Sequence, residues 1–368
     1  MADRILTLRE LNRATLARQL LLERESMPLP AVIERLAGLQ AQLARAPYVG
    51  LWTRVSELHR EALDQLIDNR TVIKATWVRA TLHLCTANDY LRFRTTLQPM
   101  LTRAASTIGK GRGAKFDQNK LLQAAREYIG ERPRTFAEIS EMVSILMPDQ
   151  DVGALRYAVR MHLPLVQVPV TGGWSYSNQP EFTLAESWVG RSISTEDRLP
   201  ELVVRYLAAF GPASVTDMQT WSGMAALKEP FEKLKPELKI YRAEGRREFF
   251  DAPDLAIPSG DVPAPVRFLP EFDNLLLSHS IRARVIADEH RSKVYLPGLR
   301  VAATILVDGF VRGVWKIDKT KNAAALLIEP FDKLTRDDRA ALIEEGEQLI
   351  RWVEPEAKSF EVQCKSHY

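Results

Sequence analysis

The feature that most constrains the fold is an order of elements that occurs twice in the middle of the chain. Three helical patterns precede a pair of short strand patterns, first over residues 120–178 and again over residues 199–252. In the first pair, Gly172-Gly173 has the composition of a hairpin turn. Three helices and a hairpin make up a winged helix, so we expect two such units in tandem, at residues 116–195 and 196–255. Winged helices read DNA or dock proteins, and the fold alone does not decide which.

The segments on either side have different patterns. Residues 1–115 are mostly helical, and Thr7 and Glu10 have the spacing of a capping box. Residues 256–368 are rich in strand patterns, with Asp308-Gly309 as a hairpin signal and a last helix over residues 336–353. The strands are expected at residues 266–277, 282–287, 292–296, 303–317, 324–331 and 359–364. We predict an α+β fold: an N-terminal helical or winged-helix region, tandem winged-helix domains, and a C-terminal β-barrel-like domain with a helix, whose strand patterns fit a small mixed barrel or a curled sheet.

Composition is that of an ordinary globular protein, with 46% hydrophobic and 26% charged residues. No apolar stretch approaches the length of a membrane span, and the first residues carry charges where a signal peptide needs an apolar region. Cys85 and Cys364 lie far apart, which fits a reducing compartment and no disulfide framework. A net charge of +3 permits nucleic-acid binding without requiring it.

Basic residues are concentrated in one stretch. Residues 90–115 contain no acid and six basic side chains: Arg92, Arg94, Arg103, Lys110, Arg112 and Lys115. Its glycine-rich end, residues 109–115, is expected to be a flexible segment that follows a phosphate backbone, or else a solvated linker between domains. A second basic stretch, residues 281–300, is partly compensated by Asp288 and Glu289 and is a weaker signal.

Two amides close the segment over residues 31–42. Its apolar residues repeat at threes and fours and predict one buried helical stripe, formed by Val32, Ile33, Leu36, Leu39 and Leu43. On an ideal helix Gln40 and Gln42 would lie about 200° apart. They can face one site only if the helix ends before them or the segment is extended, and Gly38 and Pro47 make such an ending plausible. The alternative is two idle amides on a surface helix.

Common catalytic signatures are missing from the sequence. It has no phosphate-binding GxxxxGKS, no GxGxxG after a strand, no GxSxG elbow and no HExxH. The six histidines form no cluster with the spacing of metal ligands. We therefore expect chemistry without a metal, cofactor or strong nucleophile. Two amides can hold a water molecule and steady a developing positive charge, but an amide is no useful general base near neutral pH.

Several blocks carry a resemblance to a known family. GLQAQ, APYVGLWTR, WVRATLHL, AFGPASVTDMQTWSG and FLPEFDNLLLSH occur in this order between about residues 8 and 363. They are similar to the AlkZ/YcaQ-type winged-helix DNA glycosylases, in which a Gln-aliphatic-Gln or Gln-aliphatic-Asp motif is catalytic. Gln40-Ala41-Gln42 matches the Gln-Gln branch. The resemblance implies tandem winged helices closed by a β-barrel, and excision of bulky alkylated purines, including N7-alkylguanines and, for some members, interstrand cross-links.

The chemistry of the substrate agrees with this implication. An N7-alkylguanine carries a positive charge, so it is a good leaving group. The enzyme must then place a water near C1′ and stabilise oxocarbenium character, which two amides can do. We expect a monofunctional enzyme with an open concave site, because a cross-linked base cannot flip freely into a closed pocket. We also expect a cytoplasmic, nucleoid-associated monomer that binds double-stranded DNA and no membrane. Both general repair and self-resistance to one genotoxin fit the motif.

Side chains expected at the DNA surface come from four segments. Residues 76–84 are expected to form a strand with Trp77, Arg79, Thr81 and His83 on one face, which contacts DNA or holds the glutamines. Asp273 is the alternative carboxylate for activating water. Trp52 is expected to pack in the core. The predicted DNA-binding residues are Arg45, Tyr48, Arg54, Arg79, Thr81, His83, Arg112, Lys115, Asp273, Asn274, Ser278, His279, Arg282 and Arg284.

Two further readings differ in class from the glycosylase. One is a regulator that binds DNA through its winged helices without catalysis, and such a protein would not need the QAQ block outside both wings. The other is a protein-interaction scaffold, which would show no salt-dependent affinity for DNA.

Overall fold

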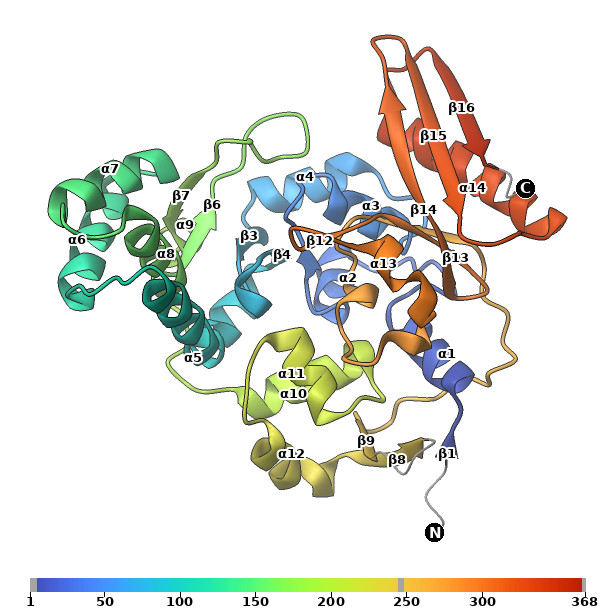
Figure 1. Ribbon diagram of the computed structural model, residues 1–368, viewed down its shortest axis with the longest axis horizontal. Coiled ribbons are helices and arrows are strands. Elements are labelled where there is room, and N and C mark those ends of the chain that lie inside the picture. Colours follow the sequence, from blue (N-terminus) through green and yellow to red (C-terminus); the bar gives the residue numbers. More distant parts are fainter. Residues whose placement is uncertain (1–4, 244–247, 366–368) are drawn as a thin grey trace.

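A six-stranded sheet joins the N-terminal part of the chain to the first three-helix unit. The computed structural model describes residues 5–243 and 248–365. In Figure 1, helices α6, α7 and α8 form a lobe on one side, strands β14, β15 and β16 project on the other, and α10, α11 and α12 lie below the N-terminal helices. The order of the six-stranded sheet is β2-β4-β3-β6-β7-β5. It therefore spans the boundary predicted at residue 115, and the domain limits themselves stay a prediction.

In the N-terminal part, the helix predicted over residues 31–42 ends early and is followed by a short strand. Its elements are β1 (Ile5–Leu6), α1 (Leu8–Arg18), α2 (Leu29–Arg35), β2 (Leu39–Gln40), α3 (Ala46–Trp52), α4 (Arg60–Asp68), β3 (Val72–Thr76) and β4 (Leu82–Thr86). The capping box of Thr7 and Glu10 is confirmed. Helix α2 ends at Arg35, before the glutamines, and the next turn has positive φ at both Ala37 (56°) and Gly38 (84°). The single stripe over residues 31–43 is therefore wrong, and Leu43 is 45% exposed.

The strand predicted over residues 76–84 is two antiparallel strands joined by a tight turn. Strand β3 pairs with β4, and the Trp77 N–H donates to the Thr81 carbonyl across the turn. Arg79 and Ala80 have φ values of 55° and 58°. Positive φ in two successive residues other than glycine leaves no trace in a pattern of apolar residues. The expected alternation of Trp77, Arg79 and Thr81 on one strand face is therefore wrong.

Most of the basic stretch is helical, and only residues 112–115 of the predicted flexible segment lie outside a helix. Helix α5 (Ala87–Gly111) includes Gly109 and Gly111, and its C-cap is Arg112. One turn later, Asp117 caps α6 by accepting from the Lys120 N–H. The basic side chains of residues 90–111 are therefore carried on a rigid rod, which fixes their spacing.

Both three-helix units are found in the predicted order. The first contains β5 (Arg134–Thr135), α6 (Gln118–Glu131), α7 (Phe136–Leu146), α8 (Val152–His162), β6 (Leu165–Gln167), β7 (Glu181–Leu184) and α9 (Ala185–Val189). The second contains α10 (Leu199–Phe210), α11 (Val215–Ser222), α12 (Lys228–Leu234), β8 (Lys239–Ala243) and β9 (Glu248–Asp251). The turn of the second strand pair lies outside the described residues. In the first, Gly172-Gly173 lies inside the long loop between β6 and β7 and is not a two-residue turn.

The C-terminal part is an open sheet covered by one helix. Strands β10 (Arg267–Leu269), β13 (Thr304–Val307), β14 (Phe310–Lys319), β15 (Ala323–Pro330) and β16 (Ser359–Cys364) pair in that order, and α14 (Arg336–Val353) packs against them. Within the described residues β10 does not pair with β16, so the predicted closed barrel is not found. Residues 282–284 form a 3-10 turn, and α13 (Arg291–Val294) precedes a small hairpin of β11 (Tyr295–Leu296) and β12 (Arg300–Val301). Strand β10 stops early because Pro270 and the positive φ of Phe272 follow it.

The β6–β7 loop reaches across to the N-terminal helices (Figure 1). The Trp174 ring meets the Tyr48 ring edge-on at 5.1 Å, and the Arg60 guanidinium lies 3.7 Å from the centre of the Trp174 ring. We expect Trp174→Ala to lower the free energy of unfolding by about 2 kcal/mol, since it removes an aromatic pair and a cation–π contact. Urea unfolding measures this change. Val170→Ala in the same loop, where Val170 is 44% exposed, should change it by less than about 0.5 kcal/mol.

Candidate active site

Gln40 and Gln42 lie against the same strand. After the turn at Gly38, β2 runs antiparallel to β4, with Gln40 opposite His83. The Ala41 N–H extends the ladder by donating to the Leu82 carbonyl at 2.8 Å. Gln40 is 7% exposed, whereas Gln42 is exposed. Because the helix ends before Gln40, the two amides are not held on opposite sides of a helix and can act together.

The hydrogen bonds of the two amides fix which way each one faces. Arg79 Nη2 donates to Gln40 Oε1 at 2.7 Å, and the Leu82 N–H donates to Gln42 Oε1 at 3.3 Å. Guanidinium and backbone N–H groups can only donate, so each amide must turn its oxygen toward its partner. The NH₂ groups then point away from these partners and donate to no other group among the described residues, and each oxygen keeps one lone pair.

Arg79 connects the glutamine segment to the second three-helix unit. Its Nη1 donates to the Trp221 carbonyl at 2.5 Å, near the end of α11. Burial and the nearby charge of Arg282 lower the pKa of Arg79 to about 10. The guanidinium therefore keeps its charge at neutral pH and holds Gln40 with a charge-assisted hydrogen bond.

His83 lies behind Gln40 as a neutral ring. It is 1% exposed, and burial together with the Arg79 charge lowers its pKa to about 3. Its Nδ1 lies 3.2 Å from the Thr81 carbonyl, which can only accept, so Nδ1 carries the proton. Nε2 then has a free lone pair, and it finds no partner within the described residues. The His83 ring therefore packs beneath the β2–β4 pair and is too buried to contact DNA.

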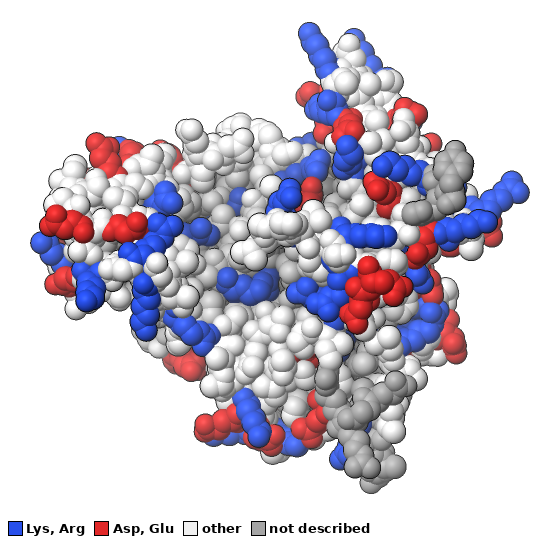
Figure 2. All heavy atoms as spheres, in the orientation of Figure 1, with Lys and Arg blue, Asp and Glu red and all other residues white. Residues whose placement is uncertain are grey.

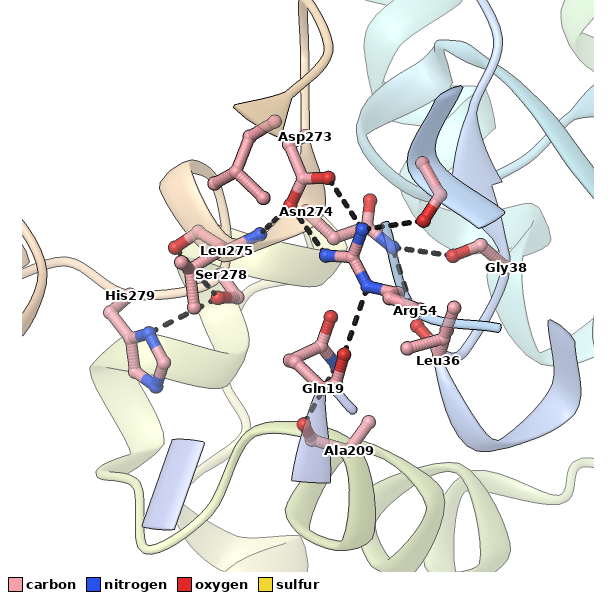
Figure 3. A network of polar contacts seen from close by, with 12 residues as sticks. Gln19, Leu36, Gly38, Arg54, Ala209, Asp273, Asn274, Leu275, Ser278 and His279 are labelled. Carbon is pink, nitrogen blue, oxygen red and sulfur yellow. Dashed lines mark hydrogen bonds and ion pairs between the residues drawn. The ribbon is translucent and has the colours of Figure 1, made fainter. Parts of the chain in front are cut away.

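A buried ion pair lies under the turn that begins β2 (Figure 3). Arg54 donates from both terminal nitrogens to Asp273, at 2.9 and 2.8 Å, and from Nε to the Gln19 carbonyl at 2.9 Å. Asn274 Nδ2 donates to the carbonyls of Leu36 and Gly38. Asp273 and Asn274 thus hold the segment that places Gln40.

Comparisons with known proteins show the family of this chain. The family model described as "DNA glycosylase AlkZ-like" matches residues 33–352. The chain belongs to the AlkZ-like DNA glycosylase family. A protein of Streptomyces sahachiroi named "Interstrand DNA cross-link repair glycosylase" is 25% identical over 359 residues, covering 91% of this chain and 93% of that protein. The solved structure of the Streptomyces sahachiroi DNA glycosylase AlkZ superposes with a TM-score of 0.80 at 22% identity, covering 98% of this chain and all of the other. The predicted family and the prediction of an enzyme are confirmed.

Several residues that the sequence placed at the DNA surface of this AlkZ-like chain are internal. Asp273 is 4% exposed and both its oxygens bond Arg54, so the alternative role of activating water is not supported. The Tyr48 hydroxyl lies between Asp64 and Ser175, where burial and Asp64 raise its pKa. Both side chains are already bonded to protein groups in the interior. The predicted DNA contacts that lie in the interior are Tyr48, Arg54, His83, Asp273, Asn274, Ser278, His279 and Arg284.

The remaining predicted contacts keep access to solvent. Arg112 and Lys115 are exposed, and Arg112 pairs with Asp151 at 3.0 Å. Arg45 is half-buried and pairs with Glu271 at 3.4 Å. Thr81, Arg79 and Arg282 are half-buried. Lys and Arg side chains gather across the middle of the face in Figure 2 and on its left side, where α5 runs in Figure 1.

Sequence reasoning missed Gln19. This buried amide donates to the Ala209 carbonyl at 2.8 Å and accepts the Arg54 Nε bond through its own backbone carbonyl. A glutamine at the end of an amphipathic helix gives no signal of such a role, because its partners lie far away in the sequence. The core position of Trp52 is confirmed by its 8% exposure.

Two neutral buried histidines predict a loss of stability in mild acid. Burial lowers the pKa of His83 and of His279 to about 3, with help from Arg79 and Arg284 respectively. Below pH 6.5 the unfolded chain binds protons that the folded chain does not, so the free energy of unfolding falls as pH falls. Asp89 has the opposite effect on stability. Burial raises its pKa to about 6, so the folded chain takes up a proton there more readily than the unfolded chain as pH falls. We expect a net loss of about 2 kcal/mol between pH 7.5 and 5.5 in urea unfolding. A stability that is unchanged or higher at pH 5.5 would show that these rings are protonated in the fold.

Proposed function

We propose that this chain is a monofunctional glycosylase that hydrolyses the N-glycosidic bond of cationic alkylated purines, of the N7-alkylguanine class, in double-stranded DNA. The observation that carries the proposal is the pair of amides held against one strand, with both oxygens fixed by donors. Gln40 and Gln42 place the attacking water and stabilise positive charge at the sugar.

The chemistry needs no stronger group. The C1′–N9 bond breaks with its electron pair going to the base, which departs as neutral 7-alkylguanine. The water oxygen bonds C1′, and its proton passes to solvent. Neither amide has to accept that proton, and their work is positioning and electrostatic stabilisation. The carboxylate of Asp273 is already held by Arg54, so it does not compete for this role.

The proposal includes bulky adducts and interstrand cross-links. The name of the Streptomyces sahachiroi relative supports this, since that protein repairs interstrand DNA cross-links. We further propose that the two three-helix units act as winged helices and that the amides face an open concave surface. Such a surface would admit a base that cannot leave the duplex. We place the protein in the cytoplasm with the nucleoid, as a monomer, and its two free cysteines suit that compartment. None of the helices in the described residues could span a membrane.

Release of 7-methylguanine from methylated duplex DNA tests the proposal. Wild-type protein should release the base and leave an abasic site. Tight, salt-dependent binding without base release would contradict the enzyme and favour a DNA-binding regulator. A protein-interaction scaffold would neither bind nor release.

A further inference from the structure

Arg79, which holds Gln40, and Arg282 come from distant parts of the chain. Arg79 is in the β3–β4 turn, and Arg282 begins the 3-10 turn at Arg282–Arg284. Helix α11 holds both segments: the Trp221 carbonyl accepts from Arg79, and Asp217 accepts from the Ser280 N–H at 2.9 Å. Asp217 and Trp221 are four residues apart, so they lie on one face of that helix. Helix α11 therefore brings the two segments together, and burial together with the charge of Arg282 lowers the pKa of Arg79.

Neither arginine has a carboxylate partner within the described residues. Arg79 donates to two neutral oxygens, on Gln40 and Trp221. The Arg282 guanidinium lies 3.9 Å from the centre of the Tyr295 ring, and its buried Nε has no partner there. Arg45 is paired with Glu271 and Arg54 with Asp273, whereas the buried Arg284 donates to Thr15 and to the Pro212 carbonyl.

Two like charges that are half-buried, and that have no carboxylate partner among the described residues, oppose folding. An anion between them would remove that penalty. Guanidinium groups suit phosphate because their planar forks donate two parallel hydrogen bonds. An anion bound by Arg79 would lie next to Gln40, because Arg79 also donates to the Gln40 side chain.

We propose that Arg79 and Arg282 form one subsite for a DNA phosphate that flanks the nucleotide under attack. The phosphate anchors the strand so that C1′ of the damaged nucleotide meets the two amides. The role of this subsite in catalysis rests on the proposed glycosylase function, but its test measures DNA binding and does not require base release. Arg282 is the residue to change, because Arg79 also holds Gln40.

The test measures affinity against salt concentration on a duplex with a tetrahydrofuran abasic site. We expect Arg282→Gln to weaken binding about tenfold and to reduce the slope of log K against log salt by about 1, the value for one lost phosphate contact. Arg282→Lys should restore the slope. Lys321→Gln removes one exposed positive charge from the β14–β15 turn and should leave both quantities at the wild-type level.

Two outcomes would overturn the subsite. One is a folded Arg282→Gln protein with the wild-type slope. The other is an Arg282→Lys protein whose slope is reduced as much as that of Arg282→Gln, since a lost charge could not then be the cause. If Arg282→Gln does not fold, the test uses Arg282→Lys alone. This variant should bind DNA about threefold to tenfold more weakly, with the wild-type slope. Wild-type affinity would refute the proposed subsite. Failure of wild-type base release would contradict the glycosylase and leave these binding results unaffected.

Discussion

Gln40→Ala is expected to lower the single-turnover rate of 7-methylguanine release by about 10²- to 10³-fold, as loss of one preorganised polar group at a reacting centre does. Gln40 is the more constrained amide of the pair, because Arg79 holds its oxygen at 2.7 Å and the side chain is nearly buried. Gln42→Ala should act in the same direction with a smaller effect, since Gln42 is exposed and its bond to Leu82 is longer, at 3.3 Å.

The matched control is Gln65→Ala, which removes an exposed amide from α4 and should keep the wild-type rate. Affinity for duplex DNA should change less than about threefold in the Gln40 variant, because the interaction acts mainly in the transition state. A Gln40→Ala protein that is folded, binds DNA and releases the base at the wild-type rate would remove Gln40 from the mechanism.

Asp273→Ala should lower the free energy of unfolding by about 3–5 kcal/mol, the usual cost of leaving one partner of a buried ion pair alone. Both Asp273 oxygens accept from Arg54, and Arg54 is 1% exposed. The uncompensated guanidinium would remain in the interior, beneath the turn that begins β2. Urea unfolding measures the loss.

Asp149→Ala serves as the control, since Asp149 is exposed in the loop after α7 and should change stability by less than about 0.5 kcal/mol. A loss of less than 1 kcal/mol for Asp273→Ala would show that Arg54 reaches water. Near-complete loss of base release in a fully stable Asp273→Ala protein would instead return Asp273 to the chemistry.

The sequence predicted correctly those helices whose position depends on residues close together in the chain. The capping box at Thr7, the three helices of each unit and helix α14 follow from helical period and caps. The turn at Arg79 and Ala80 could not be predicted, because two successive non-glycine residues with positive φ have no signature in the sequence. The glycines near residue 110 suggested a linker, yet the last turns of α5 tolerate two of them. An open sheet and a closed barrel have the same strand pattern, so the sequence could not distinguish them.

The candidate site shows the same division. The spacing of Gln40 and Gln42 indicated that the helix must end before them, and in the structure it ends at Arg35, ahead of a turn at Ala37 and Gly38. Which polar residues face DNA could not be predicted, because burial is set by tertiary packing. Asp273, Asn274 and Arg54 have the residue types of a binding surface and instead form the support beneath the glutamines.

The most direct measurement compares base release from a set of defined duplexes that differ only in one nucleotide. A site built from two neutral amides should act on a base that is already a cation and should fail on neutral lesions. We expect single-turnover release of 7-methylguanine, and release of uracil and hypoxanthine at least about 10³-fold slower, a difference of about 4 kcal/mol in the barrier. Comparable rates on the neutral bases would contradict the mechanism, because they would require a general acid or base that Gln40 and Gln42 cannot supply.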